Sequence, residues 1–185
     1  SLDLSTEQIV EKLTYLDYDK AKQLIDLIQY YVGDKLNGTG IELGAGSGIF
    51  SSVLISAGLE RIYALEIVPG LTKHVIPKVA KYYLKNNSDK VIPVLGTFDK
   101  ISLPDNSLDF AFEYDAFHHS KNLTITYKEI FKKLKPKGIL VMIDRCHPDS
   151  MTDEELETLL NKQYSKSFLI EHGYDANIKL TRREN

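Results

Sequence analysis

Three alternate glycines, Gly44, Gly46 and Gly48, constrain the fold of this chain more than any other feature of its sequence. They follow a short apolar run that predicts a strand, and they precede a segment whose apolar residues recur at helical spacing until Gly58. Glycine lets a tight turn adopt positive φ and approach a ligand, and the start of a helix offers N–H groups to polar ligand atoms. The pattern therefore predicts a nucleotide-binding turn between a strand and a helix, with tight chain packing alone as the alternative.

A carboxylate at the end of the next predicted strand supports the ligand-binding interpretation. The run 61–66 is largely apolar and ends at Glu66, which follows Gly46 by twenty residues. This separation is typical of an acid that binds a ribose, although a solvated carboxylate at a strand end is the alternative. A dinucleotide-binding turn would have its third glycine three residues after the second, where this chain has Ile49. The spacing therefore disfavours a nicotinamide cofactor.

The stretch from Glu42 to Gly48 resembles the first motif of the Rossmann-like, class I S-adenosylmethionine-dependent methyltransferases, in which an acidic residue precedes this glycine pattern. A second stretch, 96–119, resembles the family segment in which Gly-Asp-Ala leads to Leu-Pro-Phe-Pro-Asp-Asn-Ser-Phe-Asp and then to a Leu-His-His signature. The resemblance extends from about Thr39 to Asp144, well over half of the chain. It implies S-adenosylmethionine as the cofactor and methyl transfer as the activity.

The order of the predicted elements indicates an α/β fold with a doubly wound, mostly parallel sheet. Strands are predicted at 61–66, 91–95, 109–114 and 138–144 after the first one, and helices at 18–32, 70–84 and 123–134. Pro93 predicts an edge position for the third strand, and Pro77 predicts a kink or a helix start. The fifth strand is expected to be fully buried, and the apolar residues of the helix before it are expected to face the sheet, namely Ile125, Ile130, Phe131 and Leu134.

We expect one globular domain with three parts: a helical N-terminal cap at 1–38, a cofactor-binding α/β core at 39–144, and a helix with a polar tail at 145–185. Capping boxes predict helix starts near Ser5 and Thr152. The last part has no pair of apolar runs for the antiparallel hairpin with which the family closes its sheet. The chain is therefore expected to lack that hairpin and to be truncated, so that a missing C-terminal segment or a second copy covers the edge of the fifth strand.

The composition disfavours two classes of partner. A net charge of -3 and a pI of about 6.0 give no general attraction to nucleic acid, and no apolar run is long enough to cross a membrane. A lysine cluster, 132–137, is attributed to favourable charge at a helix C-terminus rather than to a polyanion site. Cys146 is the single cysteine and excludes an internal disulfide, so we expect a cytoplasmic protein.

Spacing, strand ends and resemblance together assign cofactor contacts to residues that follow the predicted strands. They are Glu42, Gly44, Ala45, Gly46, Gly48, Glu66, Ile67, Thr97, Phe98, Glu113 and Tyr114. Relatives often bind the adenine amino group with the Asp of Gly-Asp-Ala, but this chain has Thr97 at that position. The ring of Phe98 could pack on the adenine or belong to the core.

Three residues near the fourth strand are candidates for catalysis: His118, His119 and Tyr114. An imidazole titrates near neutral pH and can accept a proton, although positioning of the methyl acceptor needs no dedicated base. Capping of the following helix is the favoured alternative role for the histidines. No metal is expected, because successive residues rarely converge on one ion and no carboxylate or cysteine spacing completes a site.

The methyl acceptor is expected to be an O, N or C nucleophile of a small molecule. The Asn/Asp-Pro-Pro-Tyr pattern that is typical of methyltransferases acting on amino groups of DNA bases is absent, since residues 113–116 read Glu-Tyr-Asp-Ala. Tyr15, Tyr18 and His147 are candidates for an acceptor pocket. The alternatives are a non-catalytic S-adenosylmethionine-binding or assembly module of a longer protein and, less favoured, an NAD-dependent oxidoreductase.

Overall fold

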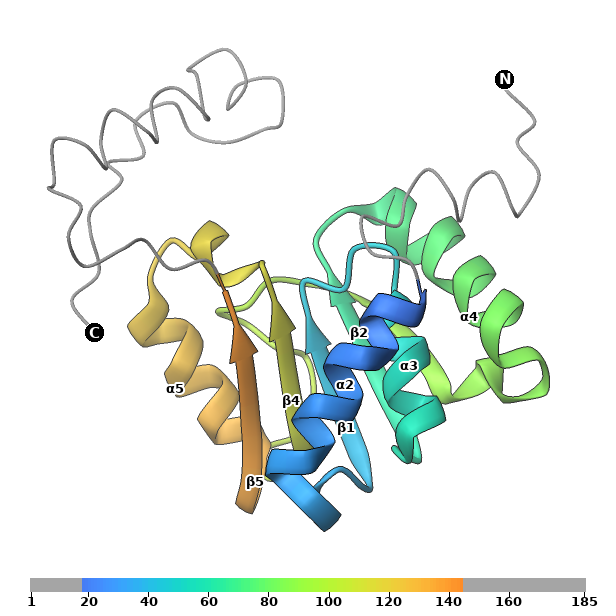
Figure 1. Cartoon of the computed structure of the whole chain (residues 1–185). Coiled ribbons are helices and arrows are strands. Elements are labelled where there is room, and N and C mark those ends of the chain that lie inside the picture. Colours follow the sequence, from blue (N-terminus) through green and yellow to red (C-terminus); the bar gives the residue numbers. More distant parts are fainter. Residues whose placement is uncertain (1–17, 145–185) are drawn as a thin grey trace, which may run out of the picture. The chain divides into compact units, whose positions relative to one another are not determined.

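One sheet of five strands forms the centre of the part of the chain that the structure describes (Figure 1). The computed structural model describes residues 18–144, which lie in the first of the two units into which the chain divides at Asp144. The predicted helix starts near Ser5 and Thr152, and Tyr15, Cys146 and His147, lie outside the described residues. The strands are β1 (Thr39–Leu43), β2 (Arg61–Glu66), β3 (Val91–Leu95), β4 (Leu108–Tyr114) and β5 (Leu134–Ile143).

The strand order is β3-β2-β1-β4-β5, and every neighbouring pair is parallel. The chain therefore builds outward from β1 to β3, crosses back, and builds outward again through β4 and β5. This confirms the predicted doubly wound parallel sheet. The direction reverses between β1 and β4, and sheets of this class bind ligands at the carboxyl ends of the strands beside such a reversal.

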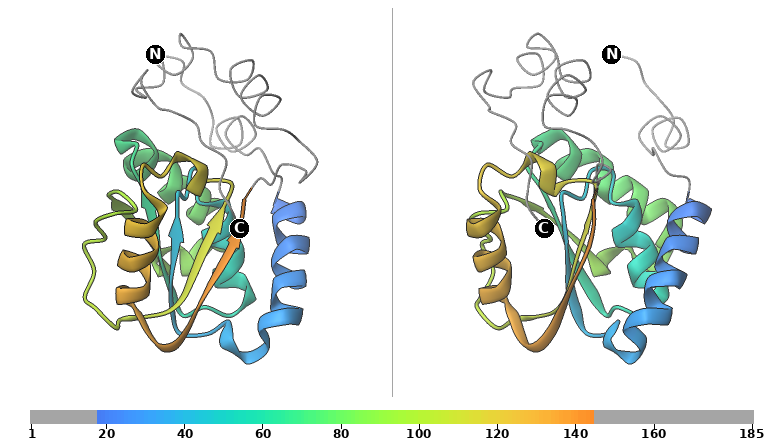
Figure 2. Two further views of the ribbon diagram at one scale, coloured as in Figure 1. Left: turned by 90° about the vertical axis from the view of Figure 1, so that its left-hand side faces the viewer. Right: turned by 60° about the vertical axis from the view of Figure 1, so that its left-hand side comes forward.

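Helices cover both faces of the sheet (Figure 2). On one face lie α2 (Tyr18–Val32), α3 (Ile49–Ala57) and α4 (Ile76–Leu84), and on the other lies α5 (Leu123–Lys133). Alternate strand residues supply the two cores, since Ile62 and Ala64 pack with α2, α3 and α4 while Tyr63 and Leu65 belong to the core beneath α5. In α3 the run from Ile49 to Ile55 is buried throughout, which holds the turn before it firmly.

The two edge strands differ in how closely they follow the sequence predictions. Pro93 lies in the edge strand β3, as predicted, and Pro77 lies at the start of α4 after a π-helical turn, Leu71–Val75. The prediction that β5 is fully buried was wrong. β5 forms the opposite edge, most of its residues are half-buried or exposed, and Met142 is 47% exposed. An edge strand has a neighbour on one side only, so apolar composition does not ensure burial.

The predicted sheet-facing side of α5 was also partly wrong. Ile130 and Leu134 are buried, but Ile125 is 49% and Phe131 82% exposed. Thr126 and Lys133 are buried on the same helix as Ile130. Polar groups can be buried there because Thr126 bonds Ser120, and the Nζ of Lys133 donates to Oδ1 of Asp105 at 2.8 Å.

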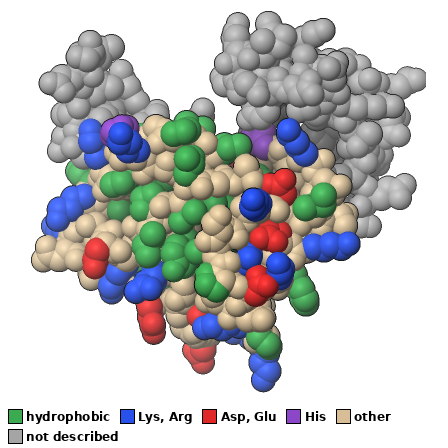
Figure 3. All heavy atoms as spheres, turned by 180° about the vertical axis from the view of Figure 1, so that it is seen from behind, with side chains coloured by type: hydrophobic (Ala, Val, Ile, Leu, Met, Phe, Trp, Pro, Cys, Tyr) green, Lys and Arg blue, Asp and Glu red, His purple; other side chains and the backbone are tan. Residues whose placement is uncertain are grey.

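Ion pairs account for much of the lysine cluster. The hydrogen bond from Lys133 lowers the pKa of Asp105, and Lys132 also pairs with this carboxylate. Lys135 lies in β5 rather than at the helix end, and it pairs with Asp109 at 2.8 Å. On the face shown in Figure 3, basic and acidic side chains lie next to one another. Within 18–144, no helix has the length and apolar character needed to cross a membrane.

Candidate functional site

The turn after β1 carries the three glycines, and each adopts positive φ: 75° at Gly44, 53° at Gly46 and 78° at Gly48. Two of them are required by close packing. A Cβ on Gly44 would lie 2.6 Å from the Cβ of Ala116, and one on Gly48 would lie 3.0 Å from Ile76. A Cβ on Gly46 would meet no atom within 4 Å. Gly46 is therefore the glycine that borders open space, where a ligand could lie against bare backbone.

Glu66 ends β2 and is directed toward this turn. Its Oε2 accepts a hydrogen bond from the Gly46 N–H at 2.8 Å, and its Oε1 accepts from the N–H groups of Ile67 at 2.9 Å and Val68 at 3.0 Å. The N–H groups of Gly44 and Ala45 donate to the carbonyl of Leu65 and tie the turn to the same strand. Backbone donors thus fix the carboxylate, which is 8% exposed, beside Gly46.

Glu42, the acid before the glycines, lies beneath the turn. Its Oε2 accepts from the Ser51 N–H at 2.8 Å and from the Ser51 hydroxyl, and only 3% of the residue is exposed. Burial raises the pKa of Glu42 to about 8, with a smaller contribution from the charge of Glu66, against the opposing effect of the Ser51 bonds. The side chain therefore caps the first turn of α3. Its predicted contact with a cofactor stays a prediction.

Glu113 has a comparable position beneath the loop that follows β4. Its Oε1 accepts from the N–H groups of Ala116 and Phe117, and among the described residues its buried Oε2 has no hydrogen-bond partner. Burial raises the pKa of Glu113 to about 7, with smaller contributions from the charges of Asp144 and Asp115 and against the opposing effect of the two backbone hydrogen bonds. No part of Glu113 is exposed, so its observed contacts are with the loop.

The remaining predicted cofactor contacts are Tyr114, Phe98, Thr97 and Ile67. The ring of Tyr114 lies 4.8 Å from that of Phe50. Phe98 is half-buried, contacts Phe117 edge-on at 5.5 Å and would lie 3.4 Å from a Cβ on Gly44. The Thr97 hydroxyl donates to Oδ1 of Asp99 at 2.5 Å. Ile67 is 66% exposed just after Glu66.

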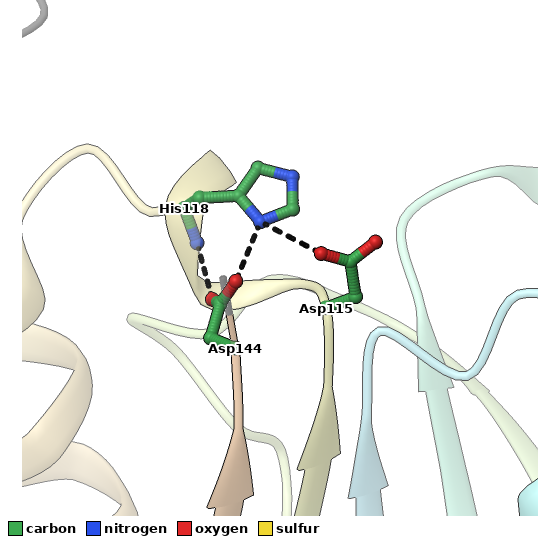
Figure 4. Close-up of side chains that lie close together, drawn as sticks. All are labelled: Asp115, His118 and Asp144. Carbon is green, nitrogen blue, oxygen red and sulfur yellow. Dashed lines mark hydrogen bonds and ion pairs between the residues drawn. The ribbon is translucent and has the colours of Figure 1, made fainter. Parts of the chain in front are cut away.

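His118 lies between two carboxylates (Figure 4). Its Nδ1 is 3.0 Å from Oδ1 of Asp144 and 3.8 Å from Oδ1 of Asp115, and its backbone N–H donates to Oδ2 of Asp144 at 2.9 Å. The ring of His119 lies 4.0 Å from that of His118, and His119 is exposed. The predicted capping role of the histidines was wrong, because the Oδ1 of Asn122 accepts from the N–H of Ile125 and caps α5.

Sequence reasoning missed the two aspartates around His118. The sequence indicated no carboxylate spacing that completes a site with the histidines, but oxygen and nitrogen atoms of Asp115, His118 and Asp144 lie within 4.8 Å of one another. The hydrogen bond between His118 and Asp144 accounts for this approach, and we assign no metal to the cluster. One signal was available: Asp144 directly follows β5, the parallel neighbour of β4, so both strands end at the same edge.

Comparisons with known proteins agree with this architecture. Residues 41–142, more than half of the 185-residue chain, match the family described as methyltransferase domain. A sterol 24-C-methyltransferase of Gibberella zeae is 33% identical over 96 residues, 48% of this chain and 25% of that protein. The glycine/sarcosine/dimethylglycine N-methyltransferase of Actinopolyspora halophila is 31% identical over 72 residues, 39% of this chain and 13% of that protein.

A solved structure gives the same result. A protein of Galdieria sulphuraria, assigned as a sarcosine dimethylglycine methyltransferase, superposes with a TM-score of 0.66 and 26% identity, covering 77% of this chain and 52% of that one. The chain spans a quarter or less of the length of the two curated relatives described above. The chain belongs to the methyltransferase domain family, and its fold is that of the Rossmann-like, class I S-adenosylmethionine-dependent methyltransferases.

Proposed function

We propose that this chain transfers the methyl group of S-adenosylmethionine to an O, N or C nucleophile of a small molecule. The open face of Gly46, with the Glu66 carboxylate 2.8 Å from its N–H, is the observation that carries the proposal. A ligand against this face would lie where the strand order reverses, beside the carboxyl ends of β1 and β4. The open face leaves bare backbone for the ligand, and the carboxylate offers acceptors for its hydroxyl groups.

Each residue of the site has a proposed part in holding the cofactor. Glu66 accepts hydrogen bonds from the ribose hydroxyls, for which a carboxylate fixed by backbone donors is a suitable acceptor. The backbone from Gly44 to Gly48 approaches the amino acid portion, and Tyr114 borders the methionine side. Ile67, Thr97 and Phe98 surround the adenine. Glu42 and Glu113 support the turn and the loop from below.

The chain's contribution to the reaction is mainly positioning. The bound cofactor supplies a methyl group that is already activated toward nucleophiles. Holding the acceptor atom in line at about 3 Å replaces a bimolecular encounter by an intramolecular one, which can contribute much of the acceleration. The turn before α3 and the loop after β4 are tied to neighbouring strands, since the Gly44 N–H donates to the carbonyl of Leu65 at 2.9 Å and the Asp115 N–H donates to the carbonyl of Ile143 at 2.8 Å.

Ligand-dependent thermal stability tests cofactor binding without knowledge of the acceptor. S-adenosylmethionine and its demethylated product should each raise Tm, by an amount that corresponds to about 2.7 kcal/mol at a hundredfold excess over Kd. NAD should leave Tm unchanged. A shift with NAD alone would contradict the proposal.

Methyl transfer separates catalysis from binding. We would incubate the chain with isotopically labelled S-adenosylmethionine and, in turn, glycine, sarcosine, a simple phenol and a sterol, because two relatives are named for amine and sterol methylation. Labelled product from any of these acceptors supports a small-molecule methyltransferase. Tight cofactor binding with labelling only of added protein or nucleic acid would show that the acceptor class is wrong.

A further inference from the structure

The paired side chains of His118 and Asp144 join the loop that follows β4 to the first residue after β5. Asp144 binds the histidine twice: its Oδ2 accepts the backbone N–H at 2.9 Å, and its Oδ1 lies 3.0 Å from Nδ1. The Asp144 side chain is 13% exposed and that of His118 27% exposed, so the contact is sheltered while the ring remains reachable. Two contacts from one carboxylate fix both the backbone and the ring of His118.

This arrangement determines which ring nitrogen carries the proton in the neutral imidazole. Nδ1 faces an acceptor-only carboxylate at 3.0 Å, with a second carboxylate oxygen, from Asp115, at 3.8 Å. A bare Nδ1 lone pair would be repelled by both, so Nδ1 holds the hydrogen and donates it to Asp144. Nε2, on the far side of the ring from Asp144 in Figure 4, then carries the lone pair.

The histidine loop also adjoins the glycine turn. Leu43 and Glu113 are register partners at the ends of β1 and β4, and Ala116 lies so close to Gly44 that no Cβ fits between them. His118 follows Ala116 by two residues within the short helical turn Phe117–His119. The loop that carries His118 therefore borders the turn at which we place the cofactor.

We propose that His118 is the general base of methyl transfer, and that the acceptor is a hydroxyl, whose proton leaves as the new bond forms, or an ammonium group, which must first give up a proton to gain the lone pair that attacks. The inference rests on the proposed function. As the acceptor oxygen or nitrogen bonds to the methyl carbon, the carbon–sulfur bond breaks and its electron pair stays on sulfur. The acceptor's proton passes to Nε2 of His118 and then to solvent. Asp144 is a positioning residue, because it acts through the imidazole.

Charged groups around the ring favour this use. Asp144 and Asp115 face Nδ1, Glu113 lies beneath the loop within electrostatic range of both aspartates, and the neutral or cationic ring of His119 lies 4.0 Å away. The carboxylates stabilise the imidazolium that forms when Nε2 takes a proton, as the aspartate does in a Ser-His-Asp triad. His119 opposes it only when protonated, and its exposure to water weakens that effect.

Nitrogen NMR of the cofactor-free chain tests the tautomer directly. With ¹⁵N-labelled histidine at mildly alkaline pH, we expect His118 to show a protonated Nδ1 and a bare Nε2. Asp144→Asn should shift His118 toward the opposite tautomer. The control variant His74→Gln, at an exposed histidine, should lose the His74 signal and leave the His118 signal unchanged. A protonated Nε2 in the unaltered chain would overturn the proposal, because no lone pair would then face an acceptor.

Kinetics with the acceptor found above test the role itself. His118→Gln should lower kcat about a hundred- to ten-thousand-fold, remove the acidic limb of the pH profile, and change the Kd for S-adenosylmethionine less than about twofold. Asp144→Asn should lower kcat at least about tenfold, and added imidazole should partly restore His118→Gly. A loss confined to KM, an unchanged acidic limb, or inactivation by a chelator that Mg²⁺ reverses would each overturn the proposal.

The two proposals can fail separately. Absence of an S-adenosylmethionine-dependent rise in Tm would contradict the proposed function while the NMR result stood. Efficient cofactor binding and turnover with a sterol alkene carbon alone would uphold methyl transfer and overturn the hydroxyl or amine acceptor, since such a carbon attacks without losing a proton first.

Discussion

The carboxyl ends of β1 and β2, here called the β1–β2 end, and those of β4 and β5, the β4–β5 end, have similar arrangements of acidic residues but different chemistry. Each has a buried glutamate beneath a loop, Glu42 under the start of α3 and Glu113 under the turn after β4. Each also has a second acid near the surface, but backbone N–H groups hold Glu66, whereas an imidazole contacts Asp144. We therefore propose that the first end accepts hydrogen bonds from a ligand and that the second moves a proton.

The two acids differ in what holds them, and this difference suits them to two different tasks at one edge of the sheet. A carboxylate held by peptide N–H groups keeps one orientation, so it suits recognition of hydroxyl groups. A carboxylate paired with histidine controls which ring nitrogen is protonated, so it suits transfer of a proton. Four predictions would sharpen or break this comparison.

The largest effect should come from the buried glutamates. A carboxyl group whose folded-state pKa lies above its ordinary value of 4.5 binds its proton more tightly in the folded protein. The stability it contributes is complete below about pH 4.5 and is lost as the pH rises to about 8 for Glu42 and about 7 for Glu113. Tm should therefore fall across this window, by on the order of 10 °C, and Glu42→Gln should remove most of the fall.

Calorimetric Tm values at several pH values check this expectation. Glu113→Gln should flatten only the lower part of the window, and Glu60→Gln, at an exposed residue, should change nothing. A Tm that rises with pH equally in the parent and in Glu42→Gln would show that Glu42 is ionised in the folded protein, and the two ends would then lose their common plan.

The second effect concerns room for the cofactor. Gly46→Ala should weaken S-adenosylmethionine binding at least about a hundredfold in calorimetry, because the new Cβ occupies the open face. Gly33→Ala is the matched control, since Gly33 also has positive φ, 57°, with no atom within 4 Å of its Cβ position. Both variants should lose about 1 kcal/mol of stability from backbone strain. Equal affinities in the two variants would remove the glycine turn from the site.

A third, smaller effect is expected at Glu66. Glu66→Ala removes a carboxylate bond to the ribose and should raise the Kd about ten- to a hundredfold. It also leaves the N–H groups of Gly46, Ile67 and Val68 without their acceptor, so Tm should fall as well. Glu60→Ala, on the loop before β2, should bind with unchanged affinity. Unaltered affinity of Glu66→Ala would exclude the residue from the cofactor site.

The smallest effect is expected from the cap of α5. Asn122→Ala removes the acceptor for the Ile125 N–H and should cost about 1 kcal/mol, or roughly 2–4 °C in Tm. The helix α5 packs beneath the β4–β5 end, whereas we place the cofactor-binding carboxylate at the β1–β2 end. Cofactor affinity should therefore not change. A marked loss of affinity would instead show that the two ends are coupled through the sheet.

Much of the fold could be predicted from local patterns. The helix at 18–32, the doubly wound parallel sheet and the edge position of Pro93 were all correct. The errors fell on the helix and strand that precede Asp144, where Phe131 and Met142 are exposed despite their apolar character. Burial there depends on what covers a residue, and amino-acid type alone does not specify the neighbour.

One part of the candidate site could likewise be predicted from local sequence, and another part could not. The glycine turn and Glu66 are connected by a spacing that a strand, a turn and a helix impose, so their proximity could be predicted from the chain. Asp115 and Asp144 have no fixed spacing with His118 that signals a pair. Their approach follows from parallel pairing of β4 and β5, which brings 26 residues of chain back to one edge.

The sequence alone determined the α/β class of the protein, the glycine turn at which a ligand can reach the backbone, and the acid that closes the adjacent strand, because these features arise within one strand–turn–helix–strand unit. The tertiary structure decided that Gly46 is the glycine facing open space, that Glu42 and Glu113 are buried supports, and that His118 meets Asp144. Those outcomes depend on which strands become neighbours and which side chains fill the space between them, and such contacts between distant segments exist only once the sheet has assembled.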